Sequence, residues 1–173
     1  GETNNQNGSD VVLIGSIYGG YGNDLIDLSS TSASPTGSVL RGSGSDEGLF
    51  GNEGDDTIIG SSSNDGFISG GRGNDILDGG LGDDILYGDS GPNEDRNIRD
   101  EGDDIFHASG GNDVIYGGTG EDIVIFSGVK SSYRISSAIE NLFQIINVKG
   151  TDGVDKLRGI EILRFDDEDL DLT

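Results

Sequence analysis

A nine-residue unit recurs through most of this chain, and a short fixed period constrains the fold more than any local propensity does. The clearest copies are GGYGNDLID from Gly19, GGRGNDILD from Gly70, GGLGDDILY from Gly79 and GGTGEDIVI from Gly117. Looser copies begin at Gly51, Gly60, Arg99 and Ala108. Each unit divides into a glycine-rich turn that ends in an acid and a short strand with one apolar residue at its centre. The repeat therefore predicts a stack of turns and strands.

The apolar residue at position eight, two places after the Asp, keeps its place in successive units. Neighbouring residues of a strand point to opposite faces, so position eight faces one way while positions seven and nine face the other. The residues predicted to fill a thin interior are Val12, Ile26, Ile58, Phe67, Leu77, Leu86, Phe106, Ile115 and Val124. The unit at Asp46 departs from this pattern, because Gly48 takes the position and Leu49 comes one residue later.

Two such units make one coil. Successive coils stack so that equivalent strands lie side by side and pair in parallel. We therefore predict an all-β fold, in which residues 1–126 form a parallel β-roll (a β-solenoid) of nine-residue repeats. Pro35 and Pro92 fall where the period fails. Because proline cannot donate a hydrogen bond to a strand ladder, we expect loop insertions near residues 29–40 and 91–100.

The regular spacing of the glycines ends after Phe126. Ordinary strand patterns follow at residues 133–135, 142–148 and 162–165. We expect residues 127–173 to form a small β-rich C-terminal cap, which covers the last coil and prevents end-to-end association.

The charge of the chain limits its partners. Thirty-three acidic residues face ten basic ones, which gives a formal net charge of -23. Such a chain repels itself, disfavours nucleic acid and anionic membrane surfaces, and calls for cations. There is no cysteine, so disulfides are excluded, and no apolar run of about 18 residues predicts a transmembrane segment.

The turns carry the donor atoms that calcium prefers. Ca²⁺ takes six to eight oxygen ligands, including carboxylates and backbone carbonyls. Glycines at positions one, two and four permit positive φ angles, so carbonyl groups can turn inward beside the Asp. One turn offers too few oxygens, so each of several Ca²⁺ ions would lie between a turn and its stacked neighbour two units along. The carboxylate ligands predicted are Asp24, Asp46, Asp56, Asp65, Asp75, Asp84, Asp104, Asp113 and Asp122.

This spacing predicts which acids share an ion. The expected pairs are Asp56 with Asp75, Asp65 with Asp84, Asp104 with Asp122, Asp24 with Asp56, and Asp46 with Asp65. If the excursion at Gly91 loops out, Asp84 and Asp104 form a further pair. In the unit that starts at Gly88, Asn93 stands where an Asp is wanted, so we expect weaker or missing occupancy between Asp75 and Asp113.

Some features of the sequence bear on catalysis, disorder and partner recognition. His107 is the only histidine, and acid pairs such as Asp83–Asp84 recur inside the turn motif, so we do not expect an enzyme. Glycine- and acid-rich chains are often disordered, but the apolar register argues against disorder when calcium is present. An outward apolar stripe at position seven leaves two interpretations open: simple strand preference, or recognition of a partner or polysaccharide. The outward stripe comprises Leu25, Ile76, Ile85, Ile105, Val114 and Ile123.

From about Gly19 to Phe126, the units resemble the GGxGxDxUx repeat of the RTX (repeats-in-toxin) proteins. Residues 125–165 also resemble a C-terminal segment that often follows such repeats. The resemblance implies a calcium-binding parallel β-roll. It also implies carbonyl ligands from Asn52, Gly54, Gly70 and Arg72 at one ion, from Ser61, Ser63, Gly79 and Leu81 at a second, and from Asp100, Gly102, Gly117 and Thr119 at a third. The other turn glycines assigned to these sites are Gly71, Gly73, Gly80, Gly82 and Gly110.

The resemblance further implies export by the type I route of Gram-negative bacteria, with an uncleaved signal inside residues 127–173. No N-terminal signal peptide is recognisable and methionine is absent, so we expect a fragment of a larger protein. The predicted function is a secreted or cell-surface calcium-binding module that folds on meeting extracellular calcium. It would support type I secretion and the stability of an adhesin or toxin. The alternative is a carbohydrate- or partner-recognition module of a secreted adhesin or polysaccharide-modifying enzyme, with a glycan or cell-surface ligand.

Overall fold

The computed structural model describes residues 17–23, 25–27, 48–62, 64–89, 102–137, 142–147 and 153–173. Within these ranges the regular structure is strand, apart from one short 3₁₀ helix, η1 (Lys130–Ser132). The predicted all-β class is confirmed. The expected loop insertions near residues 29–40 and 91–100 lie outside the described residues, as does Val12. None of the helical structure described is long and apolar enough to cross a membrane.

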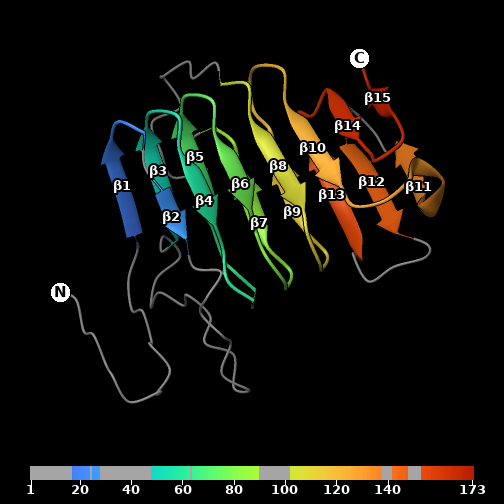
Figure 1. The fold of residues 1–173 in the computed structure, drawn as a ribbon, viewed down its shortest axis with the longest axis horizontal. Helices are drawn as coiled ribbons and strands as arrows, with labels where there is room; N and C mark the ends of the chain where they lie inside the picture. Colours follow the sequence, from blue (N-terminus) through green and yellow to red (C-terminus); the bar gives the residue numbers. More distant parts are fainter. Residues whose placement is uncertain are drawn as a thin grey trace.

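The strands form two sheets (Figure 1). The order in the first sheet is β1 (Ile17–Tyr21), β3 (Leu49–Glu53), β5 (Ile68–Arg72), β7 (Ile85–Tyr87), β9 (Val114–Tyr116), β13 (Val154–Arg158), β12 (Leu142–Asn147) and β11 (Tyr133–Ser137). The order in the second is β2 (Leu25–Asp27), β4 (Thr57–Ile59), β6 (Ile76–Asp78), β8 (Ile105–Ala108), β10 (Ile123–Phe126), β14 (Ile162–Arg164) and β15 (Asp169–Asp171).

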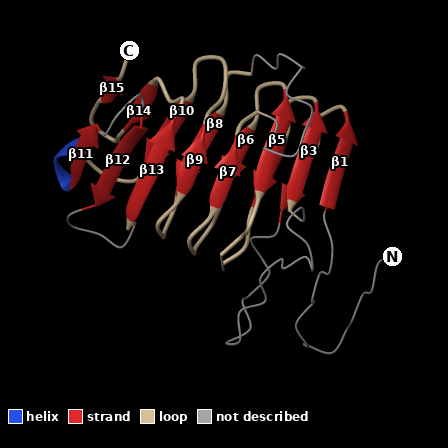
Figure 2. Cartoon of the chain, turned by 180° about the vertical axis from the view of Figure 1, so that it is seen from behind, coloured by secondary structure: helices blue, strands red, loops and turns tan. Residues whose placement is uncertain are grey.

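Consecutive strands of the repeat region lie in opposite sheets, so two repeats make one coil. Each strand pairs in parallel with the strand one coil further along, from β1 to β9 in the first sheet and from β2 to β10 in the second. The coils follow one another along the long axis of the molecule, as both ribbon views show (Figures 1 and 2). The predicted parallel β-roll is confirmed.

The interior is a single layer of apolar side chains between the two sheets. Of the described residues predicted to fill it, all but one are buried: Ile26, Ile58, Leu77, Leu86, Phe106, Ile115 and Val124. Their side chains form one hydrophobic cluster along the roll. The chain has few apolar residues, and burial of this layer supplies its hydrophobic stabilisation.

Phe67 is the exception, and its predicted place in the interior is wrong. Ile68, one residue later, is fully buried, whereas Phe67 is half-buried. Ile68 lies in register between Leu49 and Leu86, which are also buried. Gly66 fills position seven without a side chain, and β5 begins at position nine, two residues later than strands such as β6, which begins at position seven. Phe67 therefore turns to the outer face of the sheet.

On that outer face Phe67 belongs to a ladder of aromatic rings, one from each coil. Ring centroids lie 5.1 Å apart from Tyr18 to Phe50, 6.0 Å from Phe50 to Phe67, 4.8 Å from Phe67 to Tyr87, and 4.7 Å from Tyr87 to Tyr116. Three of these four pairs are stacked, so most ring faces are covered by a neighbouring ring. Cross-strand aromatic pairs of this kind stabilise neighbouring strands.

Parallel stacking continues beyond residue 126. Strand β13 pairs in parallel with β9, and β14 pairs in parallel with β10. Antiparallel strands then finish both sheets, β12 and β11 on one side and β15 on the other. Phe126, Tyr133 and Phe165 pack together at this end. Residues 127–173 thus contribute a last coil of the roll as well as antiparallel strands that cover it.

Candidate metal centre

The acid at position six of each described turn is buried. The side chains concerned are at most 3% exposed, and they are Asp56, Asp65, Asp75, Asp84, Asp104, Asp113 and Asp122. A buried carboxylate is costly unless hydrogen bonds and positive charge compensate for its lost hydration. The turns must therefore supply both.

Backbone N–H groups supply the first part of that compensation. The amide of Asp56 donates to Asp75 Oδ1 at 2.7 Å, that of Asp75 donates to Asp104 Oδ1 at 2.9 Å, and that of Asp104 donates to Asp122 Oδ1 at 2.9 Å. We call Asp56, Asp75, Asp104 and Asp122 the first row. The predicted neighbours Asp56 with Asp75 and Asp104 with Asp122 are brought together.

The remaining acids form a second row, which comprises Asp65, Asp84 and Asp113. The amide of Asp65 donates to Asp84 Oδ1 at 2.6 Å, and the amide of Asp84 donates to Asp113 Oδ1 at 3.0 Å. Because consecutive turns lie at opposite edges of the roll, the two rows do not mix. The predicted neighbours Asp65 and Asp84 are also brought together.

The predicted pair of Asp84 with Asp104 is wrong. Asp84 faces Asp113, and Asp104 faces Asp75; the partners in each pair are 29 residues apart instead of 19. The long step between Asp84 and Asp104 is one ordinary step with extra residues inserted, so the turns on either side still lie at opposite edges. For the same reason Asp75 and Asp113 belong to different rows, so they do not form the pair between which weaker or missing occupancy is expected.

The other carboxylate oxygen, Oδ2, lies beside the position-one glycine of its own turn in six of these acids: Asp56, Asp65, Asp75, Asp84, Asp104 and Asp122. A Cβ placed on Gly51 would overlap both Asp56 Oδ2 and the carbonyl of Gly70 in the next coil. A Cβ on Gly88 would meet the Asp104 Oδ2 atom and the carbonyl of Gly117 in the same way. A carboxylate oxygen and a carbonyl oxygen from neighbouring turns thus converge beside the position-one glycine. A residue with a Cβ at that position would clash with both oxygens.

The turn backbone approaches equally closely at positions two and four. Gly73 has a φ of +116° and packs against the carbonyl of Gly54 one coil earlier. Asn52 has a φ of +82°, a conformation that Asn adopts more readily than most residues. These conformations turn carbonyl groups toward the neighbouring turn, as the sequence predicts for position-two and position-four residues.

Burial changes the acidity of these carboxyl groups. Desolvation, with repulsion from neighbouring acids, raises the pKa of Asp84 and of Asp104 to about 8, that of Asp122 to about 7 and that of Asp113 to about 6. Desolvation also raises the pKa of Asp65. Backbone hydrogen bonds oppose these shifts but do not cancel them. The folded turns therefore favour a bound proton, or a cation in its place.

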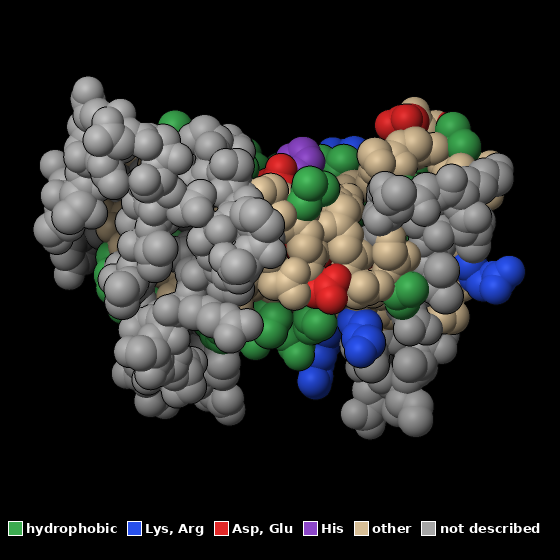
Figure 3. Space-filling model, turned by 90° about the horizontal axis from the view of Figure 1, so that it is seen from below, with side chains coloured by type: hydrophobic (Ala, Val, Ile, Leu, Met, Phe, Trp, Pro, Cys, Tyr) green, Lys and Arg blue, Asp and Glu red, His purple; other side chains and the backbone are tan. Residues whose placement is uncertain are grey.

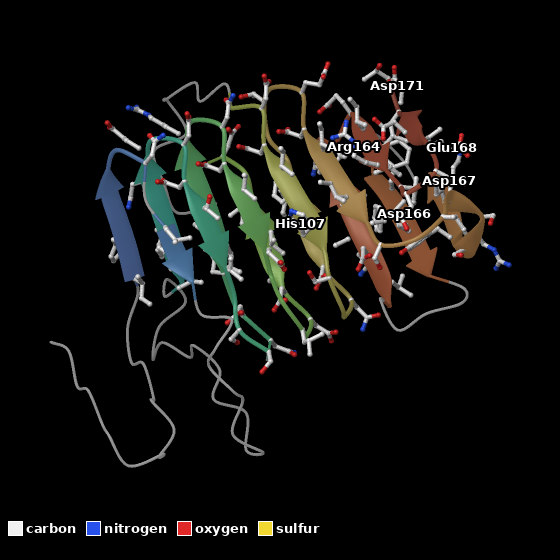
Figure 4. The ribbon with its side chains drawn as sticks, in the orientation of Figure 1. His107, Arg164, Asp166, Asp167, Glu168 and Asp171 are labelled. Carbon is white, nitrogen blue, oxygen red and sulfur yellow. The ribbon has the colours of Figure 1, made fainter. Side chains whose placement is uncertain are left out.

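The donor set fits a hard divalent cation. The Oδ2 atoms of Asp84, Asp104 and Asp122 are buried and have no hydrogen-bond partner among the described residues. No group of three or more His, Cys, Asp or Glu side chains converges in that part of the chain, so backbone carbonyls would have to complete the coordination. His107 is exposed on β8 (Figure 4). Oxygen donors from carboxylates and carbonyls suit calcium.

The predicted carbonyl and glycine positions divide between the two edges. First-row turns contain Asn52, Gly54, Gly70, Gly71, Arg72, Gly73, Gly102, Gly117 and Thr119. Second-row turns contain Ser61, Gly79, Gly80, Leu81, Gly82 and Gly110. Asp24, Asp46, Ser63 and Asp100 lie outside the described residues.

Two acids that the sequence reasoning missed extend the rows into the C-terminal segment. Asp113 N donates to Asp155 Oδ1 at 3.0 Å, and Asp122 N donates to Glu161 Oε2 at 2.9 Å. The signal for Asp155 was present, because residues 150–158 read GTDGVDKLR and match the repeat at positions one, four, six and eight. No such signal marks Glu161.

Comparison with known proteins agrees with this geometry. The family model for the RTX calcium-binding nonapeptide repeat matches four copies, at residues 16–30, 41–67, 66–94 and 99–128, which together cover more than half of the chain. Among solved structures, the extracellular lipase LipA from Serratia marcescens is 30% identical over 66% of this chain and 15% of the lipase chain, with a TM-score of 0.30. This chain therefore spans less than a sixth of that lipase. No curated protein matches. Its repeats place the chain in the family of the RTX calcium-binding nonapeptide repeat.

Proposed function

We propose that this chain is the calcium-dependent folding module of a larger secreted or cell-surface protein. The observation that carries the proposal is the two rows of buried acids. At Asp104 and Asp122, one carboxylate oxygen accepts a backbone amide from the preceding coil, and the other lies beside a position-one glycine and a carbonyl of the next coil. When bound, calcium supplies positive charge and accepts those oxygens as ligands.

The chain's own residues make folding depend on that charge. Without cations, the turn acids must be desolvated beside one another, and the net charge of -23 opposes any compact state. With cations, the same acids gain ligand bonds that exist only when neighbouring turns are stacked. A ligand that binds only the folded state stabilises it by mass action.

This coupling suits a protein that is exported before it folds. Extracellular modules bind calcium with dissociation constants on the order of 10⁻⁴–10⁻³ M. At low cytosolic calcium the chain would stay open and pass through a type I export machinery, and outside the cell it would close. The export route and the adhesin or toxin nature of the parent protein are part of this proposal.

Circular dichroism with calcium titration tests the proposed function. In ion-free buffer at pH 8 we expect an unfolded spectrum, and calcium should convert it to a β-sheet spectrum in one transition. Chelator should reverse the change, and magnesium at equal ionic strength should not reproduce it. A β-sheet spectrum that is the same with and without calcium would reject a calcium-dependent module.

A recognition function is the second candidate, and one observation favours it. Position-seven side chains line up across the second sheet, where Leu25, Thr57, Ile76, Ile105, Ile123 and Ile162 are in register. Leu25 is 69% exposed and Ile76 is 39% exposed. Hydrophobic side chains are also visible beside charged ones on the face seen from below (Figure 3). An exposed apolar line of this kind can bind a partner, although β-branched residues also suit strands.

Binding assays in calcium distinguish the two candidates. The Ile76→Thr variant keeps a strand-forming residue but shortens the apolar line. If recognition is the function, saturable binding to glycans or cells should fall while the calcium-induced fold is unchanged. If the wild-type chain shows no saturable binding, the folding role stands alone. We propose no catalytic role, since the repeated acids serve the turns and the side chain of the single histidine, His107, is exposed on β8.

A further inference from the structure

The first row does not end with the last nonapeptide turn. A Cβ placed on Gly117 would overlap both Asp122 Oδ2 and the carbonyl of Gly159. Gly51 and Gly88 show the same pair of oxygens, their own acid and the carbonyl of the next coil. The Gly159 carbonyl therefore takes the place that a position-one glycine carbonyl takes between earlier coils.

Glu161 takes the place of the next acid in the row. Its Oε2 atom accepts the Asp122 amide at 2.9 Å, as Asp122 Oδ1 accepts the Asp104 amide. The strands on either side keep the same register, since Ile162 aligns with Ile123. Arg158 aligns with Tyr116 and Ile162 with Ile123, so residues 159–161 span the distance that residues 117–122 span in the last nonapeptide turn. The longer Glu side chain compensates for the shorter backbone.

Asp122 supplies an independent indication of a ligand. Its side chain is fully buried, and its Oδ1 atom is occupied by the Asp104 amide at 2.9 Å. Its Oδ2 atom is buried, has no hydrogen-bond partner among the described residues, and lies beside the same glycine as the Gly159 carbonyl. A buried carboxylate oxygen in this position requires a cation or a proton.

The end of the second row differs at position one. There the position-one residue of the last complete nonapeptide turn is Ala108, a buried alanine, where the first row has Gly117. Ala108 has a methyl group at position one. At Gly117 the corresponding space is taken by Asp122 Oδ2 and the Gly159 carbonyl oxygen. For this reason an additional site of this kind is expected at the end of the first row alone.

We propose that Asp122, Glu161 and the Gly159 carbonyl form an additional calcium site at the junction between the repeats and the C-terminal strands. The site uses one acid from outside the nonapeptide repeats, and it would fasten the last coil of the roll to the segment that covers it. This inference rests on the proposed calcium-binding function, and it deepens that function by adding an ion which the repeat pattern does not predict.

Ion counting on the full 173-residue chain tests the site. Calcium bound per chain is measured by equilibrium dialysis with elemental analysis for the wild type, for Glu161→Gln and for Glu121→Gln. Glu121 is an exposed neighbour of Asp122 and serves as the matched control for loss of one charge. We expect Glu161→Gln to bind one ion fewer, or to bind one ion at least tenfold more weakly, and Glu121→Gln to match the wild type.

The possible outcomes separate this inference from the proposed function. If the wild type binds no calcium, both fail. If the wild type binds calcium and folded Glu161→Gln binds the same number with the same affinity, only the additional site is overturned. If Glu161→Gln does not fold, crystals of the wild type in calcium decide. Ion density between Asp122 and the Gly159 carbonyl supports the site. If ion density is present between Asp104 and Asp122 but absent between Asp122 and the Gly159 carbonyl, the inference is overturned.

Discussion

Two adjacent acids in one turn, Asp103 and Asp104, have different roles. Asp104 is fully buried, and its pKa is raised to about 8, mainly by desolvation. Asp103 is exposed, and its Oδ1 atom accepts the backbone amide of Glu121 at 2.9 Å. The inner acid at position six therefore faces the cation site, while the outer residue at position five fastens one turn to the next.

This difference predicts unequal effects of removing one charge. Asp104→Asn removes a carboxylate ligand, and we expect calcium affinity to fall at least tenfold, which corresponds to ~1.4 kcal/mol. Asp103→Asn keeps an acceptor oxygen at the surface, so stability should change by no more than about 0.5 kcal/mol. Calorimetric calcium titration and urea unfolding in calcium measure both effects. Equal losses in the two variants would contradict the assignment of position six as the ligand.

Ala108 provides a second test at the residue scale. In ion-free conditions at low pH, Ala108→Gly should destabilise the fold by about 0.5–1 kcal/mol, because glycine loses more backbone entropy on folding. In saturating calcium this loss should be offset or reversed, because the variant opens the position-one place beside Asp113. The comparison is made by unfolding with and without calcium. Equal destabilisation in both conditions would show that the methyl group does not limit cation binding.

Among the elements, strand β5 shows how one glycine shifts a register. Because Ile68 is fully buried and Phe67 lies in the outer aromatic ladder, their truncations should differ. We expect Ile68→Ala to cost ~2–5 kcal/mol through lost burial and a cavity. Phe67→Ala should cost about 1 kcal/mol through lost ring contacts. Urea unfolding in calcium gives both values, and a larger loss for Phe67→Ala would contradict the register.

The elements also show what the sequence can predict and what it cannot. The strands after each regular turn, and residues such as Leu77 and Val124 in the interior, follow from the period alone. Phe67 was misplaced because two apolar residues stand together after Gly66, and the period does not decide between them. Asp84 was mispaired because its distance from Asp104 fits either an insertion or a missing unit. Only the parallel register distinguishes the two.

Position five contains a further regularity that the sequence reasoning did not use. The amide of Asp55 donates to Asn23 Oδ1, the amide of Asn74 donates to Asp55 Oδ1, and the amide of Asp103 donates to Asn74 Oδ1. These bonds run from each coil to the one before it, whereas the position-six bonds run to the one after it. Asn or Asp is needed there as an acceptor. Each coil is thus fastened to both neighbours at its turns.

For the whole molecule, the raised pKa values predict how pH replaces calcium. The pKa of Asp84 rises from 3.8 to about 8 in the fold, so between these values the folded group holds a proton that the unfolded group has lost. The ion-free fold should therefore be most stable near pH 4 and lose stability as pH rises toward 8. Calcium affinity should change in the opposite direction, because protons compete for the same oxygens.

Circular dichroism of metal-free protein from pH 4 to pH 9 measures this dependence. We expect β-sheet content at the acid end, loss of it with rising pH, and recovery on addition of calcium at pH 8. Parallel calcium titrations at pH 6 and pH 8 should give the tighter binding at pH 8. Metal-free protein that is more folded at pH 8 than at pH 4 would contradict the predicted direction.

The alternation of turns between two edges restricts how a protein of this design can change length during evolution. Loss of a single nine-residue unit would exchange the edges of every later turn and bring strands from one sheet beside strands from the other. Loss or duplication of two consecutive units removes or adds a complete coil and leaves all later neighbours in place. Extra residues inserted between strands β7 and β8 preserve that order, as the 29-residue separation of Asp75 and Asp104 illustrates. Lengthening by gene duplication should therefore proceed in even numbers of units.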